Sequence, residues 1–219
     1  MDPAYSACVQ QVFVDLHKKG LIYRGRRMVN WCPVSRTALS DEEVIMKEQK
    51  GHLWHFRVAV DGEKDRFLTI ATTRPETTPG DTAIAVNPQD PRYGSLIGKF
   101  ALRPLPPEQP ESQRRIPIVG DDHVEMEFGT GVLKVTPAHD PADFAIGQRH
   151  GLPAIEVIDE TGHMNEAAGR QLAGLERTKA RATAAEQLKE LGCLEKEEPY
   201  TNQVGFSERA NLSPGFWGG

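Results

Sequence analysis

The segment 125–151, EMEFGTGVLKVTPAHDPADFAIGQRHG, constrains local structure more than any other part of the sequence. Apolar and polar side chains alternate through GVLKVTP, which is the two-residue period of a β-strand. Pro137 lacks a backbone donor and ends that strand, and Asp140 followed by Pro141 is typical of a helix N-cap and first turn. Gly151 can take the left-handed conformation that closes a helix. The segment therefore predicts a strand that ends at Pro137 and a helix that begins at Asp140 and stops just before Gly151.

The alternation gives this predicted strand two different faces. Leu133 and Val135 point to one side, and the polar residues of the strand point to the other. One hypothesis is that the strand end and the helix start meet at the rim of a pocket, where four side chains converge on a polar ligand: Lys134, Thr136, Asp140 and Asp143. The alternative is that the two aspartates are ordinary capping residues. Spacing alone leaves both interpretations open.

A second polar segment follows a predicted hairpin. Residues 52–60 alternate between apolar and polar side chains, Asp61-Gly62 is a favoured turn, and residues 67–74 form the returning strand. The hairpin runs into TTRPETTPGDTAIAV at 72–86, where four threonines, an arginine and a glutamate lie within seven residues that two prolines restrain. Such a segment can bind small polar groups, although its hydroxyls could instead satisfy their own backbone.

The rest of the pattern consists of many short strands and few helices. Residues 4–19 have the apolar spacing of an amphipathic helix that ends at Gly20, and residues 175–191 have helical composition with Gly192 as the stop. Further strands are expected between 20 and 44, at 81–86, 96–103, 116–119 and 154–159, and after Pro199. This mixture predicts an α/β fold with a mixed, barrel-like β-sheet core and surrounding helices.

The same pattern suggests three parts of the chain. We expect a helix and connecting strands over 1–50, a core domain over 51–205 and an irregular tail over 206–219. At 219 residues the chain can bury a substantial core, and 38% hydrophobic with 26% charged residues is ordinary for a soluble protein. No apolar run reaches the length of a membrane span, and the first residues lack the pattern of a signal peptide. We therefore expect a cytoplasmic protein.

Neither the cysteines nor the histidines have the spacing of a metal site. Cys8, Cys32 and Cys193 are odd in number and far apart, which argues against a disulfide framework and against a C-x-x-C zinc site. A competing idea is a metal held by side chains that are close in sequence: His123, His139, Asp140, Asp143 and His150. No pair of them has the H-x-x-x-H spacing that fixes two ligands on one helix face. We expect no metal and no cofactor.

Several long phrases occur together and in order. They are NWCPVSRTALSDEEV at 30–44, TTRPET at 72–77, GDTAIAVNPQDPRY at 80–93 and FGTGVLKVTPAHDPADF at 128–144. On these phrases the chain resembles the editing domain of valyl-tRNA synthetases, which are class I aminoacyl-tRNA synthetases, from about Tyr5 to Arg209. The related leucine and isoleucine enzymes share a TTRP segment and a later aspartate, but KVTPAHD at 134–140 looks valine-type.

This resemblance implies a reaction and a substrate. The domain would hydrolyse the ester bond of threonine wrongly attached to tRNA(Val), and it would recognise threonine rather than valine by its hydroxyl. The signatures HIGH and KMSKS, which bind ATP in class I enzymes, are absent, so no ATP-dependent ligase activity is expected of this fragment. The implied partners are the 3′ end of tRNA(Val) and the remainder of the synthetase. The alternative is a non-catalytic or degenerate module that only binds the tRNA 3′ end.

The resemblance also implies roles for individual residues. Asp143 would hold the ammonium group of the aminoacyl ester, and Asp140, with Thr136 and Lys134, would line the region of its side chain and carbonyl. The terminal adenosine and the substrate backbone would contact a second set: Thr72, Thr73, Arg74, Glu76, Thr77 and Phe128. No histidine is expected to act as general base. Thr78-Pro79 stands where the family usually has two apolar residues, so one wall of the pocket is expected to differ.

Overall fold

The computed structural model describes residues 2–25, 27–107, 109, 111–208, 210 and 215–218, with the backbone alone at 111, 112 and 215–218. The α-helices are α1 Pro3–Lys18, α2 Glu111–Arg114, α3 Pro141–His150 and α4 Arg177–Glu190. The strands are β1 Met28–Cys32, β2 Thr37–Leu39, β3 Val44–Val60, β4 Phe67–Thr72, β5 Ala83–Val86, β6 Phe100–Leu102, β7 Arg115–Gly120, β8 Val132–Val135, β9 Leu194–Ser207 and β10 Gly215–Gly218. Short 3-10 helices are η1 Asp41–Glu43, η2 Pro75–Gly80, η3 Gly94–Leu96 and η4 Glu166–Ala168.

The main sheet is mixed and strongly curved, as the sequence predicts. Its strand order is β4-β3-β6-β7-β5-β8, with β9 paired to β3 along a second stretch. All pairs in this sheet are antiparallel except β5 with β7, which is parallel. The two ends of the order, β4 and β8, also lie against each other, so the sheet curls toward a barrel. The expected α/β fold with a barrel-like core and flanking helices is confirmed.

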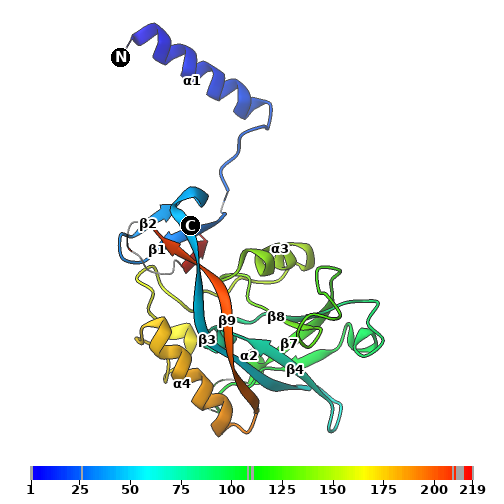
Figure 1. Cartoon of the computed structure of the whole chain (residues 1–219). Coiled ribbons are helices and arrows are strands. Elements are labelled where there is room, and N and C mark those ends of the chain that lie inside the picture. Colours follow the sequence, from blue (N-terminus) through cyan, green and yellow to red (C-terminus); the bar gives the residue numbers. More distant parts are fainter. Residues whose placement is uncertain are drawn as a thin grey trace.

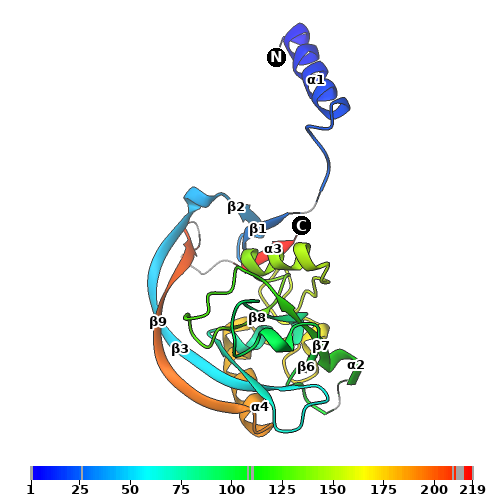
Figure 2. The ribbon, with the colours of Figure 1, turned by 90° about the vertical axis from the view of Figure 1, so that its right-hand side faces the viewer.

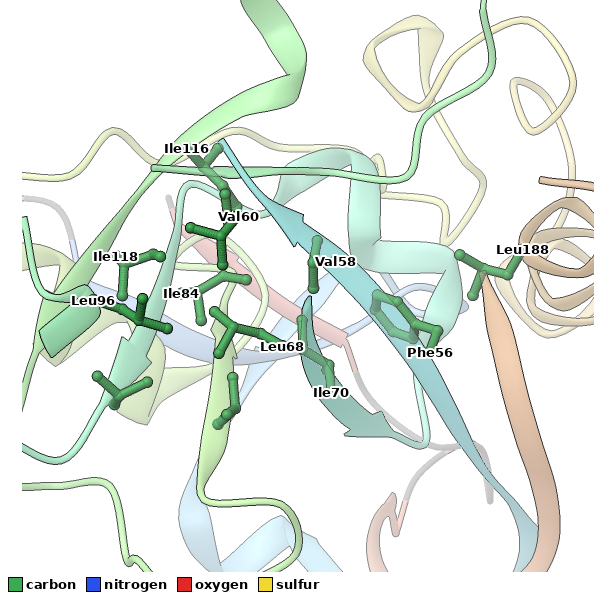
Figure 3. Packing of buried hydrophobic residues seen from close by; sticks show 13 residues of the cluster. Phe56, Val58, Val60, Leu68, Ile70, Ile84, Leu96, Ile116, Ile118 and Leu188 are labelled. Carbon is green, nitrogen blue, oxygen red and sulfur yellow. The ribbon is translucent and has the colours of Figure 1, made fainter. Parts of the chain in front are cut away.

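The hydrophobic core lies inside this curled sheet. The apolar side chains of the predicted hairpin point inward from β3 and β4, because every second residue of a strand faces the same side. Figure 3 shows Phe56, Val58, Leu68 and Ile70 directed toward Ile84 of β5, and all five are at most 2% exposed. Burying a large aliphatic or aromatic side chain contributes about 1.5–3 kcal/mol. This packing holds β5 and β8 in place, and the polar site lies at the ends of those strands.

Strand β3 is much longer than the hairpin requires. From Val44 onward it pairs with β9, and the two strands form a long ribbon that curves around the core in Figure 2. The division expected at residue 50 therefore falls within β3. Beyond the ribbon, β1 and β2 form a small three-stranded sheet with β10. Contrary to the expected irregular tail, Gly215–Gly218 form a strand, because their backbone pairs with the free edge of β1.

The predicted helices form, with the expected end residues. Asp140 is the N-cap of α3, and Gly151 ends that helix in the left-handed conformation at φ 63°. Gly192 follows α4 with φ 67°. Helix α1 also forms, yet none of its residues is buried, and it lies apart from the rest of the molecule in Figures 1 and 2. No helix in the described part of the chain has the length and apolar character needed to cross a membrane.

The strand expected at 154–159 is wrong. The backbone N–H of Val157 donates to the ring of His139 (2.9 Å) instead of to a neighbouring strand, and Ile158 forms a single bridge with Met164. Val157 and Ile158 are consecutive, yet both are buried in a second apolar cluster against α4. A regular strand would turn one of the two away, so their burial reflects packing of an irregular segment.

Candidate active site

Lys134 lies at the centre of a buried polar cluster. Strand β8 turns its side chain to the same face as Val132, and the lysine is 7% exposed. Its ammonium group donates to the hydroxyls of Thr77 (2.8 Å) and Thr136 (2.5 Å) and to Oδ1 of Asp81 (2.8 Å). An ammonium group has three N–H donors, so the chain itself uses every donor of Lys134.

Asp81 is the residue of this cluster that sequence reasoning missed. It is 3% exposed, and its Oδ1 also accepts a hydrogen bond from the Thr136 hydroxyl at 2.5 Å. Burial raises the pKa of the Asp81 carboxyl, and the Lys134 ammonium acts in the opposite direction. The pairing of β5 with β8 brings it here, because β5 begins just after Asp81 and Ala83 pairs with Val135, which places the aspartate beside the end of β8.

Helix α3 brings two more carboxylates to this corner. Oδ1 of Asp140 accepts from the backbone N–H groups of Ala142 (2.8 Å) and Asp143 (3.1 Å), so the capping interpretation is correct for Asp140. Asp143 is 7% exposed, and its Oδ2 accepts from the backbone N–H of Thr136 at 2.8 Å. Burial raises the pKa of Asp143 to about 6 against the opposing effect of Lys134. Each aspartate keeps one oxygen that has no hydrogen-bond partner among the described residues.

The threonine-rich segment meets the corner from β4 and η2. Nη1 of Arg74 donates to the backbone oxygen of His139 at 2.8 Å, and Thr77 donates to the backbone oxygen of Arg74 at 3.0 Å. The hydroxyl of Thr72 accepts from the backbone N–H of Arg74 at 3.1 Å, so Thr72 and Thr77 do satisfy nearby backbone groups. Thr73 is half-buried beside them. The two polar segments therefore pack against each other, as expected.

Glu76 is fully buried, with 0% exposure. Its two carboxylate oxygens accept from Nη2 (2.8 Å) and Nε (3.1 Å) of Arg181 on α4. Nε of Arg74 lies 3.8 Å from the same carboxylate. Sequence reasoning included Glu76 and Arg74 but missed Arg181, which is far away along the chain and sits in an otherwise ordinary helical pattern.

Phe128 lies apart from this buried cluster on the loop between β7 and β8. It is 72% exposed. The loop is held below it, because Arg92 donates to the backbone oxygen of Met126 (2.5 Å) and forms an ion pair with Asp90 (2.7 Å). Gly131 takes φ 72°, and a Cβ there would lie 2.6 Å from the Arg92 guanidinium. An exposed aromatic ring on an anchored loop is able to stack on a planar ligand.

The sequence of the whole region matches a known family. The family model described as tRNA synthetases class I (I, L, M and V) matches residues 1–208. This chain belongs to that family. Its similarity to valine–tRNA ligases is 54% identity over 212 residues for Parasynechococcus marenigrum (strain WH8102) and 49% over 209 residues for Clostridium perfringens (strain 13 / Type A). These alignments cover 97% and 95% of this chain but 22% and 23% of the relatives, so the chain spans less than a quarter of their length.

A solved structure gives a weaker likeness. A chain of the ternary complex of Agrobacterium radiobacter K84 agnB2 LeuRS with tRNA and LeuAMS matches with a TM-score of 0.47 and 22% sequence identity. The match covers 98% of this chain and 33% of that one. This likeness is too low to bear on the chemistry of the site.

One further buried cation and one buried ring border the corner of this class I synthetase chain. Arg103 is 6% exposed, and its Nη1 donates to the backbone oxygens of Pro79 (2.7 Å) and Asp81 (2.8 Å), which fixes the turn that carries Asp81. His139 is 2% exposed, and burial lowers its pKa to about 3, so its ring is neutral. His150 lies at the other end of α3 against Asp121 (2.9 Å). Among the described residues, no three or more His, Cys, Asp or Glu side chains gather as metal ligands would.

Proposed function

We propose that this chain hydrolyses the ester bond of threonine mischarged onto tRNA(Val), as the editing part of a valine–tRNA ligase. Three findings support the proposal: the family match over residues 1–208, relatives that are valine–tRNA ligases, and a corner where a buried carboxylate, hydrogen-bonded through one oxygen to the backbone of Thr136, lies near Lys134. The observation that carries it is Asp143, which is held by one oxygen and has the other available beside the threonine-rich segment.

Asp143 is the proposed anchor for the ammonium group of the aminoacyl ester. A buried carboxylate with one oxygen fixed by a backbone N–H forms a directional, charge-assisted hydrogen bond with its other oxygen. Such a contact would hold the ester carbonyl near the attack geometry, which is a large part of what positioning contributes to catalysis. The ammonium would also offset the cost of burying the carboxylate, which is the cause of its raised pKa.

Asp140 is the proposed sensor of the threonine hydroxyl. A hydrophobic site that accepts valine rejects threonine only about a hundredfold, a limit for which the valine enzyme is itself the standard illustration, so a second site is needed. The Asp140 oxygen that does not cap α3 can accept a hydrogen bond from threonine. Valine would leave it desolvated at a cost of about 1–3 kcal/mol, which corresponds to roughly tenfold to a hundredfold discrimination.

The other site residues have a supporting part in this proposal. Lys134 and Thr136 hold Asp81 and Thr77 in place, and through them they shape the region around the ester carbonyl. Arg74 and Thr73 would contact the substrate backbone and the terminal ribose, with the hydroxyls of Thr72 and Thr77 beside them. Phe128 would pack against the adenine. We assign no histidine as general base, so in this proposal catalysis rests on a positioned water molecule and on preorganised electrostatics.

The remainder of the synthetase is the proposed partner of α1. Large apolar side chains on this helix are exposed, including Tyr5 (71%), Val9 (55%) and Phe13 (58%). The chain spans 22% of the length of its Parasynechococcus relative, so most of such a protein lies outside it. A helix with an apolar stripe and no buried residue is stabilised when another surface covers that stripe.

Side-by-side deacylation of threonyl- and valyl-tRNA(Val) tests the proposed function. We expect this chain to release free threonine much faster than free valine. Asp143→Ala should abolish threonine release without loss of the fold, and Asp122→Ala, which removes an exposed carboxylate elsewhere, should release threonine at the wild-type rate. A wild-type chain that retards the mobility of the tRNA but releases no threonine would be a binding module instead. Threonine release by Asp143→Ala would show that the anchor is assigned wrongly.

A further inference from the structure

Helix α4 reaches the threonine-rich segment through one side chain. Three of the four buried residues of this helix are alanines, Ala180, Ala184 and Ala185, which lets the helix pack closely. From this helix Arg181 forms a two-point contact with Glu76, with N–O distances of 2.8 and 3.1 Å. This planar geometry fixes the direction of both groups as well as their distance.

The contact leaves Glu76 no surface with which to reach a ligand. The glutamate is 0% exposed, and both of its carboxylate oxygens are engaged by Arg181. Two other arginines share its surroundings: Arg74, whose Nε lies 3.8 Å away, and Arg177 of α4, whose guanidinium interacts electrostatically with the same carboxylate. A fully buried carboxylate needs a cation, because an unpaired buried charge is strongly unfavourable. Glu76 is therefore shared between a helix arginine and a site arginine.

Arg74 continues this path to the catalytic corner. Its Nη1 donates to the backbone oxygen of His139, the residue just before the N-cap of α3. Arg181, Glu76 and Arg74 thus form a continuous series of contacts from α4 to the turn that precedes Asp140. The side chain of Arg74 is 30% exposed, so it is the member of this series that a ligand can reach.

We propose that Arg181 is a positioning residue for the deacylation: by holding Glu76 on α4, it sets where the guanidinium of Arg74 meets the tRNA end. This inference rests on the proposed function. With Arg181 present, the negative charge of Glu76 is compensated. The guanidinium of Arg74 can then contact both His139 and the substrate. Without Arg181, Glu76 would draw Arg74 into a direct pair, away from the tRNA end.

The kinetic signature is a change in KM rather than in kcat. We expect Arg181→Met to raise the KM for threonyl-tRNA(Val) by about tenfold, the scale of one lost charge-assisted hydrogen bond, with kcat within about twofold of wild type. The KM of Arg181→Lys should lie between those of wild type and Arg181→Met, because lysine cannot make the two-point contact. Lys179→Met, which removes an exposed cation from the same helix, is the matched control and should keep the wild-type KM.

A double variant separates positioning from folding. Glu76→Gln with Arg181→Met removes both charges, so it should recover the stability lost in Arg181→Met. Its KM should stay about tenfold raised, because Arg74 has lost the carboxylate that sets its place. A folded double variant with the wild-type KM, or a folded Arg181→Met with lowered kcat and unchanged KM, overturns the inference while the proposed function stands. A wild-type chain that releases no threonine would overturn the proposed function itself.

Discussion

The two ends of helix α3 hold aspartates of opposite character. At the N-terminal end Asp143 is 7% exposed, and burial raises its pKa to about 6 although a helix N-terminus favours negative charge. At the C-terminal end burial also acts to raise the pKa of Asp121, but hydrogen bonds from Arg149, from the backbone of His123 and from His150 lower it to about 2. This second cluster borders an open cavity of about 610 Å³.

The difference shows what each carboxylate is suited to do. Asp121 has the Arg149 cation and the His150 ring as partners in the last turn of α3, so it remains ionised and ties the helix end to β7. Asp143 shares the field of Lys134, whose three donors are spent on other residues. Its charge is therefore compensated incompletely in the chain itself. A cationic ligand would complete the compensation, which favours Asp143 over Asp121 as a binding group.

The largest effect should come from removing the buried cation. Lys134→Met leaves Asp81 in the interior with the Thr136 hydroxyl as its remaining side-chain hydrogen-bond donor. Breaking a buried ion pair on one side typically costs about 3–5 kcal/mol. We expect a loss of this size in the free energy of unfolding, measured by chemical denaturation with the slope of the transition unchanged.

The cluster at the other end of α3 supplies the control. Arg149→Met removes a cation that is 50% exposed, and such pairs contribute about 1 kcal/mol or less. Asp81→Asn combined with Lys134→Met should recover part of the loss, because no buried charge is then left unpaired. Equal losses in the free energy of unfolding for Lys134→Met and Arg149→Met would show that burial does not make the two clusters differ in stability.

The next largest effect is the pH dependence that Asp143 gives to the free energy of unfolding. A carboxyl whose pKa is raised on folding, from 3.8 to about 6, contributes stability below pH 4 that is lost as the pH rises through 6. Asp143→Asn should therefore be more stable than wild type at pH 8, by an amount on the order of 2 kcal/mol, and the gap should close toward pH 4. Threonine release by the wild type should fall as the pH drops below about 6, because the anchor loses its charge.

Denaturation of both variants from pH 4 to pH 8 measures this slope. Asp122→Asn, at an exposed position, should run parallel to wild type throughout. A gap between Asp143→Asn and wild type that does not change with pH would show that Asp143 titrates near its ordinary value. In that case burial would not govern its pKa.

The fold could be predicted where its signals are local. The α3 cap, its closing Gly151 and the β3–β4 hairpin each depend on neighbouring residues, and all three are present in the structure. The expected proximity of the two polar segments is also present, with Thr77 at 2.8 Å from Lys134. The strand at 154–159 was wrong because a short apolar segment can form a paired strand or an irregular segment packed on a helix, and its sequence does not distinguish the two.

The missed site residues depend on contacts between distant parts of the chain. Arg181 lies 105 residues from Glu76, and nothing in its helical surroundings marks it as a partner. Asp81 and Lys134 meet because β5 and β8 pair, which a single sequence does not reveal. The expected role of Glu76 as a ligand contact remains a prediction, and its 0% exposure favours the indirect role argued for it above.

A smaller effect of opposite sign is expected at Asp121. Its pKa is lowered on folding, so its contribution to stability is present above about pH 4 and is lost as the pH falls toward 2. Asp121→Asn should lower the free energy of unfolding by about 1 kcal/mol at pH 7, since its partners are partly exposed. Denaturation of Asp121→Asn and wild type from pH 4 down to pH 2 should give a slope of opposite sign to that of Asp143→Asn between pH 4 and pH 8. Slopes of equal sign for the two variants would contradict the contrast between the ends of α3.

The smallest effect tests buried polar groups within one corner. Thr77 and Thr78 are neighbours and are 2% and 4% exposed, but only the Thr77 hydroxyl has hydrogen-bond partners among the described residues. Thr78→Val keeps the shape of the side chain and removes a hydroxyl whose burial costs about 1 kcal/mol, so it should stabilise the chain by up to that amount. Thr77→Val should do the reverse, because it leaves an ammonium donor of Lys134 and the backbone oxygen of Arg74 without their partner. If thermal unfolding shifts in the same direction for both variants, then partnering does not decide the cost of a buried hydroxyl here, and the argument for the buried Lys134 cluster weakens with it.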